Sequence, residues 1–171
     1  MVEHLDNIVA ELDEIGLSAK PSPFKRSTIA CTGIEYCKLA IVETKANVTA
    51  TVKTLEKKLV DIQIGRPISL HINGCPNSCA RIQTADIGLK GQLLPDGNGG
   101  TSPGFQVHLG GGLVTKDRDE AGLGRTVRGL KVTAEELPDY VERLVRRYDA
   151  EKDGDETFAS WAHRAEEEAL Q

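Results

Sequence analysis

The chain has 171 residues, enough to bury the core of one domain. Its formal net charge of −5 argues against non-specific binding to nucleic acid. It has no run of about 20 apolar residues and no secretory signal pattern, so we expect no membrane partner and a reducing, cytoplasmic location in which cysteines bind metals rather than form disulfides.

The first predicted element is an amphipathic helix that ends at Gly16. Its apolar face consists of Leu5, Ile8, Val9, Leu12 and Ile15. The segment 20–23, with two prolines, reads as a connector. We therefore expect a helix and connector in residues 1–26 and a domain in residues 27–171.

A short strand at residues 27–30 leads into the first cysteine pair, Cys31 and Cys37, spaced C-x5-C. A long helical pattern follows, from Lys38 to about Val60. Its apolar stripe predicts core packing and consists of Ile41, Val48, Val52, Leu55, Leu59 and Ile62.

The second cysteine pair, Cys75 and Cys79, is spaced C-x3-C. It follows the alternating apolar run at 68–72, which is typical of a strand with one buried face. Pro76 suits the first turn of a helix, so we predict a short helix over residues 77–83, whose unpaired N–H groups and dipole would favour thiolates. Two such corners can bring four thiolates together, the ligand set of an iron–sulfur cluster or a structural zinc. The five-residue gap suits the larger cluster better.

Three further strands are predicted at 86–94, 105–109 and 126–132, with a hairpin loop at 95–100. A capping box at 133–136 opens the next helix, which either starts later or kinks at Pro138. Its apolar face consists of Leu137, Tyr140, Val141, Leu144, Val145 and Tyr148. A last helix carries Phe158, Trp161, Ala162 and Ala165. The order β-α-β-α-β-β-β-α-α predicts an α+β fold, a mixed β-sheet with packed helices.

The residues around both cysteine pairs resemble the cluster-and-sirohaem signature of the assimilatory, ferredoxin-dependent sulfite and nitrite reductases. The matching stretches are A-C-T-G-I-E-Y-C-K-L-A-I-V-E-T-K, N-G-C-P-N-S-C-A-R, A-D-I-G-L-K-G (85–91), V-H-L-G-G-G (107–112) and F-A-S-W-A-H-R-A (158–165). The resemblance implies the C-terminal, 4Fe–4S and sirohaem-binding half of such an enzyme. It also implies that residues 1–26 close a preceding ferredoxin-like domain.

The resemblance further implies the ligands of two cofactors. A 4Fe–4S cluster would be bound by Cys31, Cys37, Cys75 and Cys79, with Cys79 also the axial ligand of the sirohaem iron. Asn77 would contact a sirohaem carboxylate, cap the predicted helix, or both. Arg81 would reach a cofactor carboxylate or sulfite, or else lie in solvent. No catalytic residue is assigned.

The implied reaction is the six-electron reduction of sulfite to sulfide, or of nitrite to ammonia, with a ferredoxin-type electron donor. Because the pocket for an anionic cofactor and substrate should be lined with basic residues, and this chain clusters few, the missing N-terminal half should supply them. The chain alone should then be inactive. The alternative is a non-enzymatic 4Fe–4S electron-transfer module without sirohaem. His71 and His108 are expected to be ordinary exposed residues, 110–112 a turn, and 166–168 a solvated face.

Overall fold

A five-stranded mixed sheet organises the computed structural model, which describes residues 2–114 and 121–171. The strands lie in the order β1-β2-β3-β4-β5, with β1, β2 and β3 parallel and β3, β4 and β5 antiparallel. Their bounds are β1 Thr28–Ala30, β2 Leu70–Asn73, β3 Ile87–Pro95, β4 Thr101–Leu109 and β5 Arg125–Thr133. The predicted α+β class, the mixed sheet and the hairpin between β3 and β4 are confirmed.

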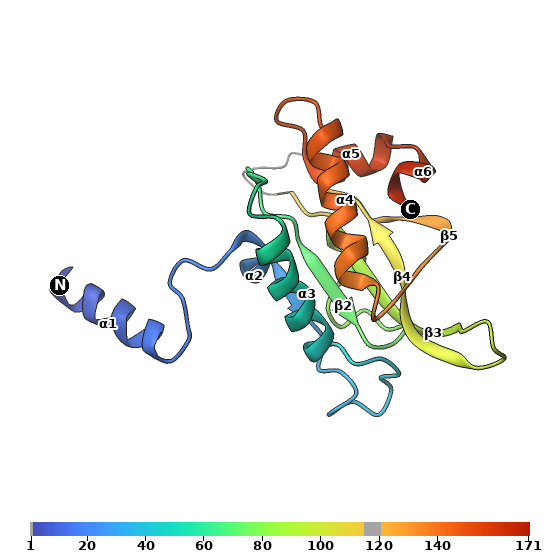
Figure 1. The fold of residues 1–171 in the computed structure, drawn as a ribbon, viewed down its shortest axis with the longest axis horizontal. Helices are drawn as coiled ribbons and strands as arrows, with labels where there is room; N and C mark the ends of the chain where they lie inside the picture. The colour runs from blue at the N-terminus through green and yellow to red at the C-terminus, as the bar shows by residue number, and fades with distance from the viewer. Residues whose placement is uncertain (1, 115–120) are drawn as a thin grey trace.

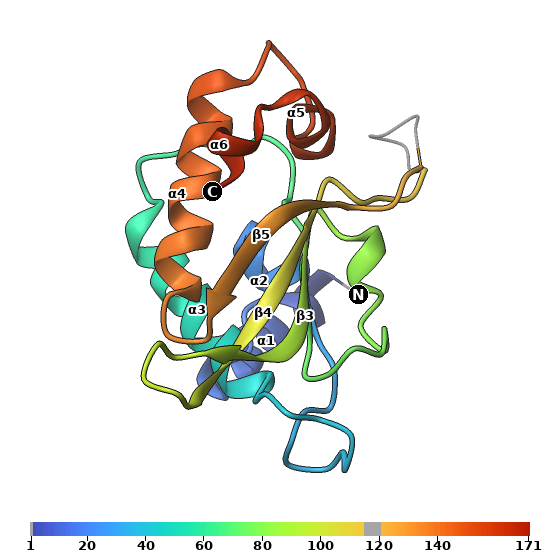
Figure 2. The same cartoon turned by 90° about the vertical axis from the view of Figure 1, so that its right-hand side faces the viewer.

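Two long helices, α3 (Lys45–Lys58) and α4 (Leu137–Glu151), lie side by side on one face of this sheet (Figure 1, Figure 2). Apolar side chains of both helices and of the strands form the core between these layers, as their spacing predicted, except that Ile41 of the predicted stripe is 39% exposed. The shorter elements are α2 Pro23–Arg26, the 3₁₀ helix η1 Ile82–Thr84, α5 Phe158–Arg164 and α6 Glu167–Leu170.

The segments directly after the cysteines differ from the sequence predictions. The helix expected from Lys38 begins only at Lys45, because the N–H groups of Ile41 and Val42 donate to the carbonyl of Gly74 instead of to a helix. The α-helix expected at 77–83 is wrong: only η1 forms there. Arg81 has φ 53° and ψ 46°, a left-handed conformation that stops a right-handed helix. The thiols therefore gain nothing from a helix dipole at this point.

The predicted capping box at the start of α4 is confirmed. The Thr133 hydroxyl accepts from the Glu136 N–H at 3.2 Å, and the Glu136 carboxylate accepts from the Thr133 N–H at 3.2 Å. The helix begins at Leu137, so Pro138 lies in its first turn without a kink. The whole predicted apolar face of α4 is buried.

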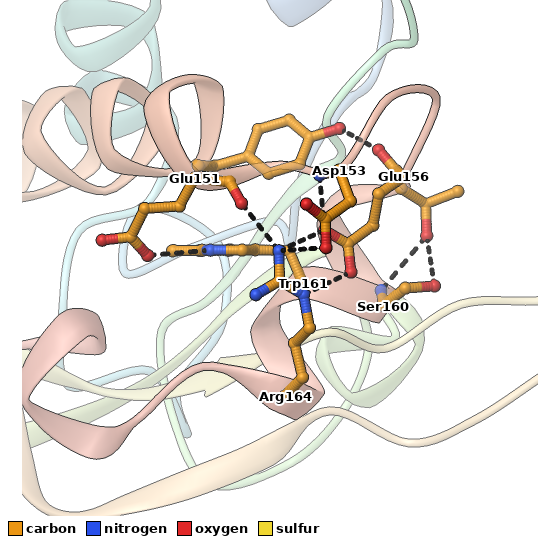
Figure 3. Close-up of polar contacts among 8 residues, drawn as sticks. Glu151, Asp153, Glu156, Ser160, Trp161 and Arg164 are labelled. Atoms are coloured by element: carbon orange, nitrogen blue, oxygen red, sulfur yellow. Dashed lines mark hydrogen bonds and ion pairs between the residues drawn. The ribbon is translucent and has the colours of Figure 1, made fainter.

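A polar network joins the end of α4 to α5 (Figure 3). The indole N–H of the buried Trp161 donates to Glu151 at 3.1 Å, and Arg164 forms two 2.7 Å hydrogen bonds with the Glu156 carboxylate. The Tyr148 hydroxyl donates to the Glu156 carbonyl at 2.5 Å. These bonds fix α5 against α4, with the buried apolar residues of the last helix inside, as predicted. The glutamates at 166–168 are exposed, also as predicted.

The first helix, α1 (Val2–Glu14), forms where it was predicted, and Gly16 follows it with φ 77°. It projects away from the rest of the chain (Figure 1). Its apolar face is uncovered: Leu5, Ile8 and Val9 are 58%, 51% and 39% exposed. No helix in the described ranges, 2–114 and 121–171, is long and apolar enough to cross a membrane.

Candidate metal centre

The two cysteine pairs follow neighbouring parallel strands. Because β1 and β2 are parallel, their carboxyl ends meet at one edge of the sheet. Cys31 comes directly after β1, and its N–H donates to the Ile72 carbonyl of β2 at 3.0 Å. Cys75 comes two residues after the end of β2. The first cysteine loop (residues 31–44) and the second cysteine loop (residues 74–81) therefore begin side by side.

Gly74 joins the two cysteine loops. Its carbonyl accepts from the N–H groups of Ile41 and Val42 at 2.7 and 3.1 Å, and its own N–H donates to the Cys31 sulfur at 3.3 Å. A Cβ at this position would lie 2.6 Å from the Val42 carbonyl oxygen, so only glycine allows the loops to approach this closely. A Cβ at Gly91 would likewise lie 2.5 Å from the Gly74 carbonyl carbon.

Buried polar side chains hold both cysteine loops in place. Four polar side chains are buried in the described part of the chain: Thr44, Thr51, His71 and Asn73. The Thr44 hydroxyl donates to the Cys31 carbonyl at 2.8 Å. The Asn73 amide donates to the Asn77 carbonyl and accepts from the Ala80 N–H at 2.8 Å. Since a buried polar group is costly unless it is hydrogen-bonded, these contacts fix the loop geometry.

The expectation that His71 and His108 are exposed is wrong. His71 is only 8% exposed, its Nδ1 lies 3.3 Å from the Arg81 carbonyl oxygen, and burial lowers its pKa. The pKa of His108 is also lowered, mainly by burial and to a smaller extent by the positive charge of Lys90. The buried Nε2 of His108 has no hydrogen-bond partner among the described residues. Strand alternation placed both correctly on the face opposite the core. It did not reveal that the second cysteine loop and η1 fold back over that face.

All four cysteines are free thiols. Cys75 is buried, Cys31 and Cys37 are half-buried, and Cys79 is exposed. Within the described ranges, no three or more His, Cys, Asp or Glu side chains form a group that could hold a metal ion. The donor set, four unpaired thiols with a backbone N–H directed at one sulfur, fits a group that takes thiolate ligands. The gathering of all four sulfurs stays a prediction.

The two predicted cofactor contacts have different surroundings. Asn77 is exposed and caps no helix, since none begins there. Arg81 lies on the surface and lines a pocket of about 380 Å³ with Arg66, His71 and Thr84. It is the only non-glycine residue with positive φ in the described part of the chain, and such strain concentrates at functional sites. Their contacts with a cofactor stay predictions.

The glycines at 110–112 turn the chain at the end of β4, where Gly110 has φ 79°. A Cβ at Gly111 would lie 2.2 Å from the Gln83 carbonyl oxygen. The close approach at this turn is therefore to the backbone of η1. Sequence reasoning assigned no role to Asn73 or Thr44 and used Gly74 only as the residue that ends a strand, although a polar residue at the end of an apolar strand, just before a cysteine loop, was a visible signal at Asn73.

Comparisons with known proteins agree with this architecture. The family model described as "Nitrite and sulphite reductase 4Fe-4S domain" matches residues 22–171. Sulfite reductase (ferredoxin) 1 of Mycolicibacterium paratuberculosis is 51% identical over 170 residues, which cover 98% of this chain and 30% of that protein. The chloroplastic ferredoxin–nitrite reductase of Zea mays is 40% identical over 111 residues, 64% of this chain and 19% of that protein.

Solved structures give the same picture. The structure of the Mycobacterium tuberculosis NirA protein superposes with a TM-score of 0.92 at 50% identity, covering 98% of this chain and 30% of that one. Dissimilatory sulfite reductase I shares the fold, with a TM-score of 0.57 at 15% identity over 84% of this chain and 50% of that one. The chain therefore belongs to the nitrite and sulphite reductase 4Fe-4S domain family. It spans about 30% of the length of the curated sulfite reductases that it matches.

Proposed function

We propose that this chain is the cluster- and sirohaem-binding part of a ferredoxin-dependent sulfite or nitrite reductase. The observation that carries the proposal is the pair of cysteine loops joined at one sheet edge with all four thiols free. Family membership and the names of the relatives support it. The reaction would be the six-electron reduction of sulfite to sulfide or of nitrite to ammonia.

The proposed ligands of the 4Fe–4S cluster are Cys31, Cys37, Cys75 and Cys79. When bound, the cluster and the sirohaem supply one-electron transfer and an iron site for the anion. The chain's own part is to hold the thiols and to exclude water from Cys75, the buried one. Cys79 is the exposed thiol, which supports its second role as axial ligand of the sirohaem iron. The pocket position of Arg81 supports a contact with an anionic group.

We further propose that residues 1–26 belong to the end of a preceding ferredoxin-like domain. The exposed apolar face of α1 supports this, because uncovered apolar surface of this kind usually packs against protein. The family match also begins only at residue 22. The missing N-terminal half would complete the cofactor pocket with its basic residues.

The proposed electron donor is a ferredoxin-type protein, as in the names of the relatives. The first cysteine loop exposes Ile34, Tyr36 and Leu39 to 54%, 72% and 65%, which offers a protein partner an apolar contact surface close to Cys37. We place the protein in the cytoplasm, where thiols are kept reduced.

Anaerobic reconstitution with iron, sulfide and sirohaem tests the proposal. We expect about four iron and four sulfide per chain, as the 4Fe–4S composition requires, and a sirohaem spectrum once the missing half is supplied. Serine replacement of any of the four cysteines should lower the iron content, whereas replacement of Ser102, which is half-buried in β4, by alanine should not. Iron uptake without any sirohaem band, even with the missing half present, would favour the electron-transfer module. Stoichiometric zinc in place of iron would contradict both.

A further inference from the structure

We propose that Asn73 is a positioning residue for the proposed cluster: its buried amide holds the second cysteine loop in the shape that places the Cys75 and Cys79 thiols. The inference rests on the proposed function, because it concerns the same four thiols. It adds a residue that ligates nothing and is nevertheless needed for the ligands to be in place.

The amide of Asn73 makes contacts on both of its sides. Asn73 is the last residue of β2 and is 0% exposed. Its Nδ2 donates to the Asn77 carbonyl, and its Oδ1 accepts from the Ala80 N–H at 2.8 Å. Asn77 lies between the two cysteines and Ala80 directly after the second. The chain that spans Cys75 and Cys79 is thus held at two points by one side chain.

Only a side chain with a donor and an acceptor can make both contacts. Leucine has a similar size but neither group, and an ionised aspartate has no donor. The backbone of Asn73 is itself tightly placed, since a Cβ at Gly91 would lie 2.6 Å from the Asn73 carbonyl oxygen. Asparagine is therefore selected here by geometry and by hydrogen-bonding capacity together.

The effect of Asn73 reaches the first cysteine loop through Gly74. The N–H of Gly74, the next residue, donates to the Cys31 sulfur at 3.3 Å. A shift of the chain at 73–74 therefore moves a hydrogen bond of Cys31 as well as the start of the second loop. Hydrogen bonds to ligating sulfurs are among the features that set the reduction potential of iron–sulfur clusters.

Two variants and one matched control test the inference. Asn73→Ala removes both hydrogen bonds, and Asn73→Asp keeps the oxygen that accepts from Ala80 but loses the donor to Asn77. The control is Thr51→Ala: Thr51 is also buried, but its hydroxyl donates to the Asn47 carbonyl at 2.8 Å within α3.

The first readout is the alkylation rate of each thiol in the cluster-free chain, followed by mass spectrometry. We expect the rate at Cys75, which is buried, to rise about tenfold in Asn73→Ala, the factor that corresponds to about 1.4 kcal/mol, with a smaller rise in Asn73→Asp. Cys37 should react at an unchanged rate in every variant. The fluorescence of Trp161, the only tryptophan, reports whether the fold is intact.

The second readout is the reconstituted cluster. In Asn73→Ala we expect a changed electron paramagnetic resonance spectrum, a shifted midpoint potential and about tenfold faster loss of iron to a chelator. Thr51→Ala should match the wild type in all three. If Asn73→Ala does not fold, Asn73→Asp is judged by the same measurements.

Unchanged Cys75 alkylation in a folded Asn73 variant, with iron loss equal to that of Thr51→Ala, would overturn the inference. A wild-type chain that takes up no iron would instead contradict the proposed function. The alkylation rates would still decide whether Asn73 holds the loop, so the two failures are distinguishable.

Discussion

Replacing Gly74 by alanine should separate the two cysteine loops. The new Cβ would lie 2.6 Å from the Val42 carbonyl oxygen and 3.1 Å from the Ala40 Cβ. A carbon–oxygen contact normally lies at about 3.3 Å, so the Val42 carbonyl must retreat by about 0.7 Å. Such overpacking costs about 1–3 kcal/mol, and weakening the hydrogen bonds to the Gly74 carbonyl adds about 1 kcal/mol. The free energy of unfolding should therefore fall by about 2–4 kcal/mol.

Urea unfolding, monitored by the fluorescence of Trp161, measures the free energy of unfolding. Thermal unfolding and the iron content after reconstitution are measured on the same variants. For a chain of this size the loss corresponds to a Tm lower by roughly 5–15 °C. Gly65→Ala is the matched control, because a Cβ there would meet nothing within 4 Å. If Gly74→Ala had the same free energy of unfolding as Gly65→Ala and the same iron content as the wild type, the site would assemble without close contact between the two cysteine loops, and the prediction would be wrong.

Three further predictions follow from the site and from the α4–α5 network. With the missing half present, Cys79→Ser should alter the spectra of both the cluster and the sirohaem, because a serine oxygen bridges soft iron centres poorly. Cys31→Ser should affect mainly the cluster spectrum. An unaltered sirohaem spectrum in Cys79→Ser would contradict the bridging role of Cys79. Glu156→Gln should cost about 1 kcal/mol at pH 7, since Arg164 is partly exposed. The Arg164 guanidinium holds the pKa of Glu156 below its ordinary value of 4.5, so the stabilisation by Glu156 is present above pH 4.5 and is lost as the pH falls through the lower pKa of the folded state. Urea titrations of the wild type and Glu156→Gln at several pH values measure this loss. A difference in stability between the two proteins that persisted in acid would contradict the prediction. The chain alone, loaded with cofactors, should reduce neither sulfite nor nitrite with a chemical reductant; measurable turnover would show that its own basic residues suffice, with Arg81 the first to test.

Local patterns predicted those parts of the fold that depend on neighbouring residues in the sequence. The apolar face of α4 and the capping box before it are set by side chains three or four positions apart, and both were predicted correctly. The same holds for the hairpin between β3 and β4, whose loop is rich in glycine. The positions of both cysteine pairs after strands could be predicted because strand alternation and the glycine that ends it are also local signals.

The parts that failed depend on contacts between distant residues. Pro76 is a favourable start for a helix, but the Ala80 N–H is taken by the side chain of Asn73 and Arg81 adopts a left-handed conformation. Likewise, Ile41 fits the apolar stripe of α3 but donates its N–H to Gly74, 33 positions along the chain. Tertiary hydrogen bonds outweighed the local preference at both loops, and no periodicity in the sequence reports such bonds.

The distribution of buried polar groups indicates how the site is built. Of the four buried polar side chains in the described ranges, Thr44, His71 and Asn73 all contact cysteine-loop residues, while Thr51 bonds within its own helix. The core between the sheet and α3 and α4 is apolar and reaches the first cysteine loop at Val42. In small zinc domains the metal supplies the folding energy itself, and the chain is unfolded without it. Here the backbone of the loops is held by protein hydrogen bonds next to an apolar core, so the fold should outlast the removal of a cofactor.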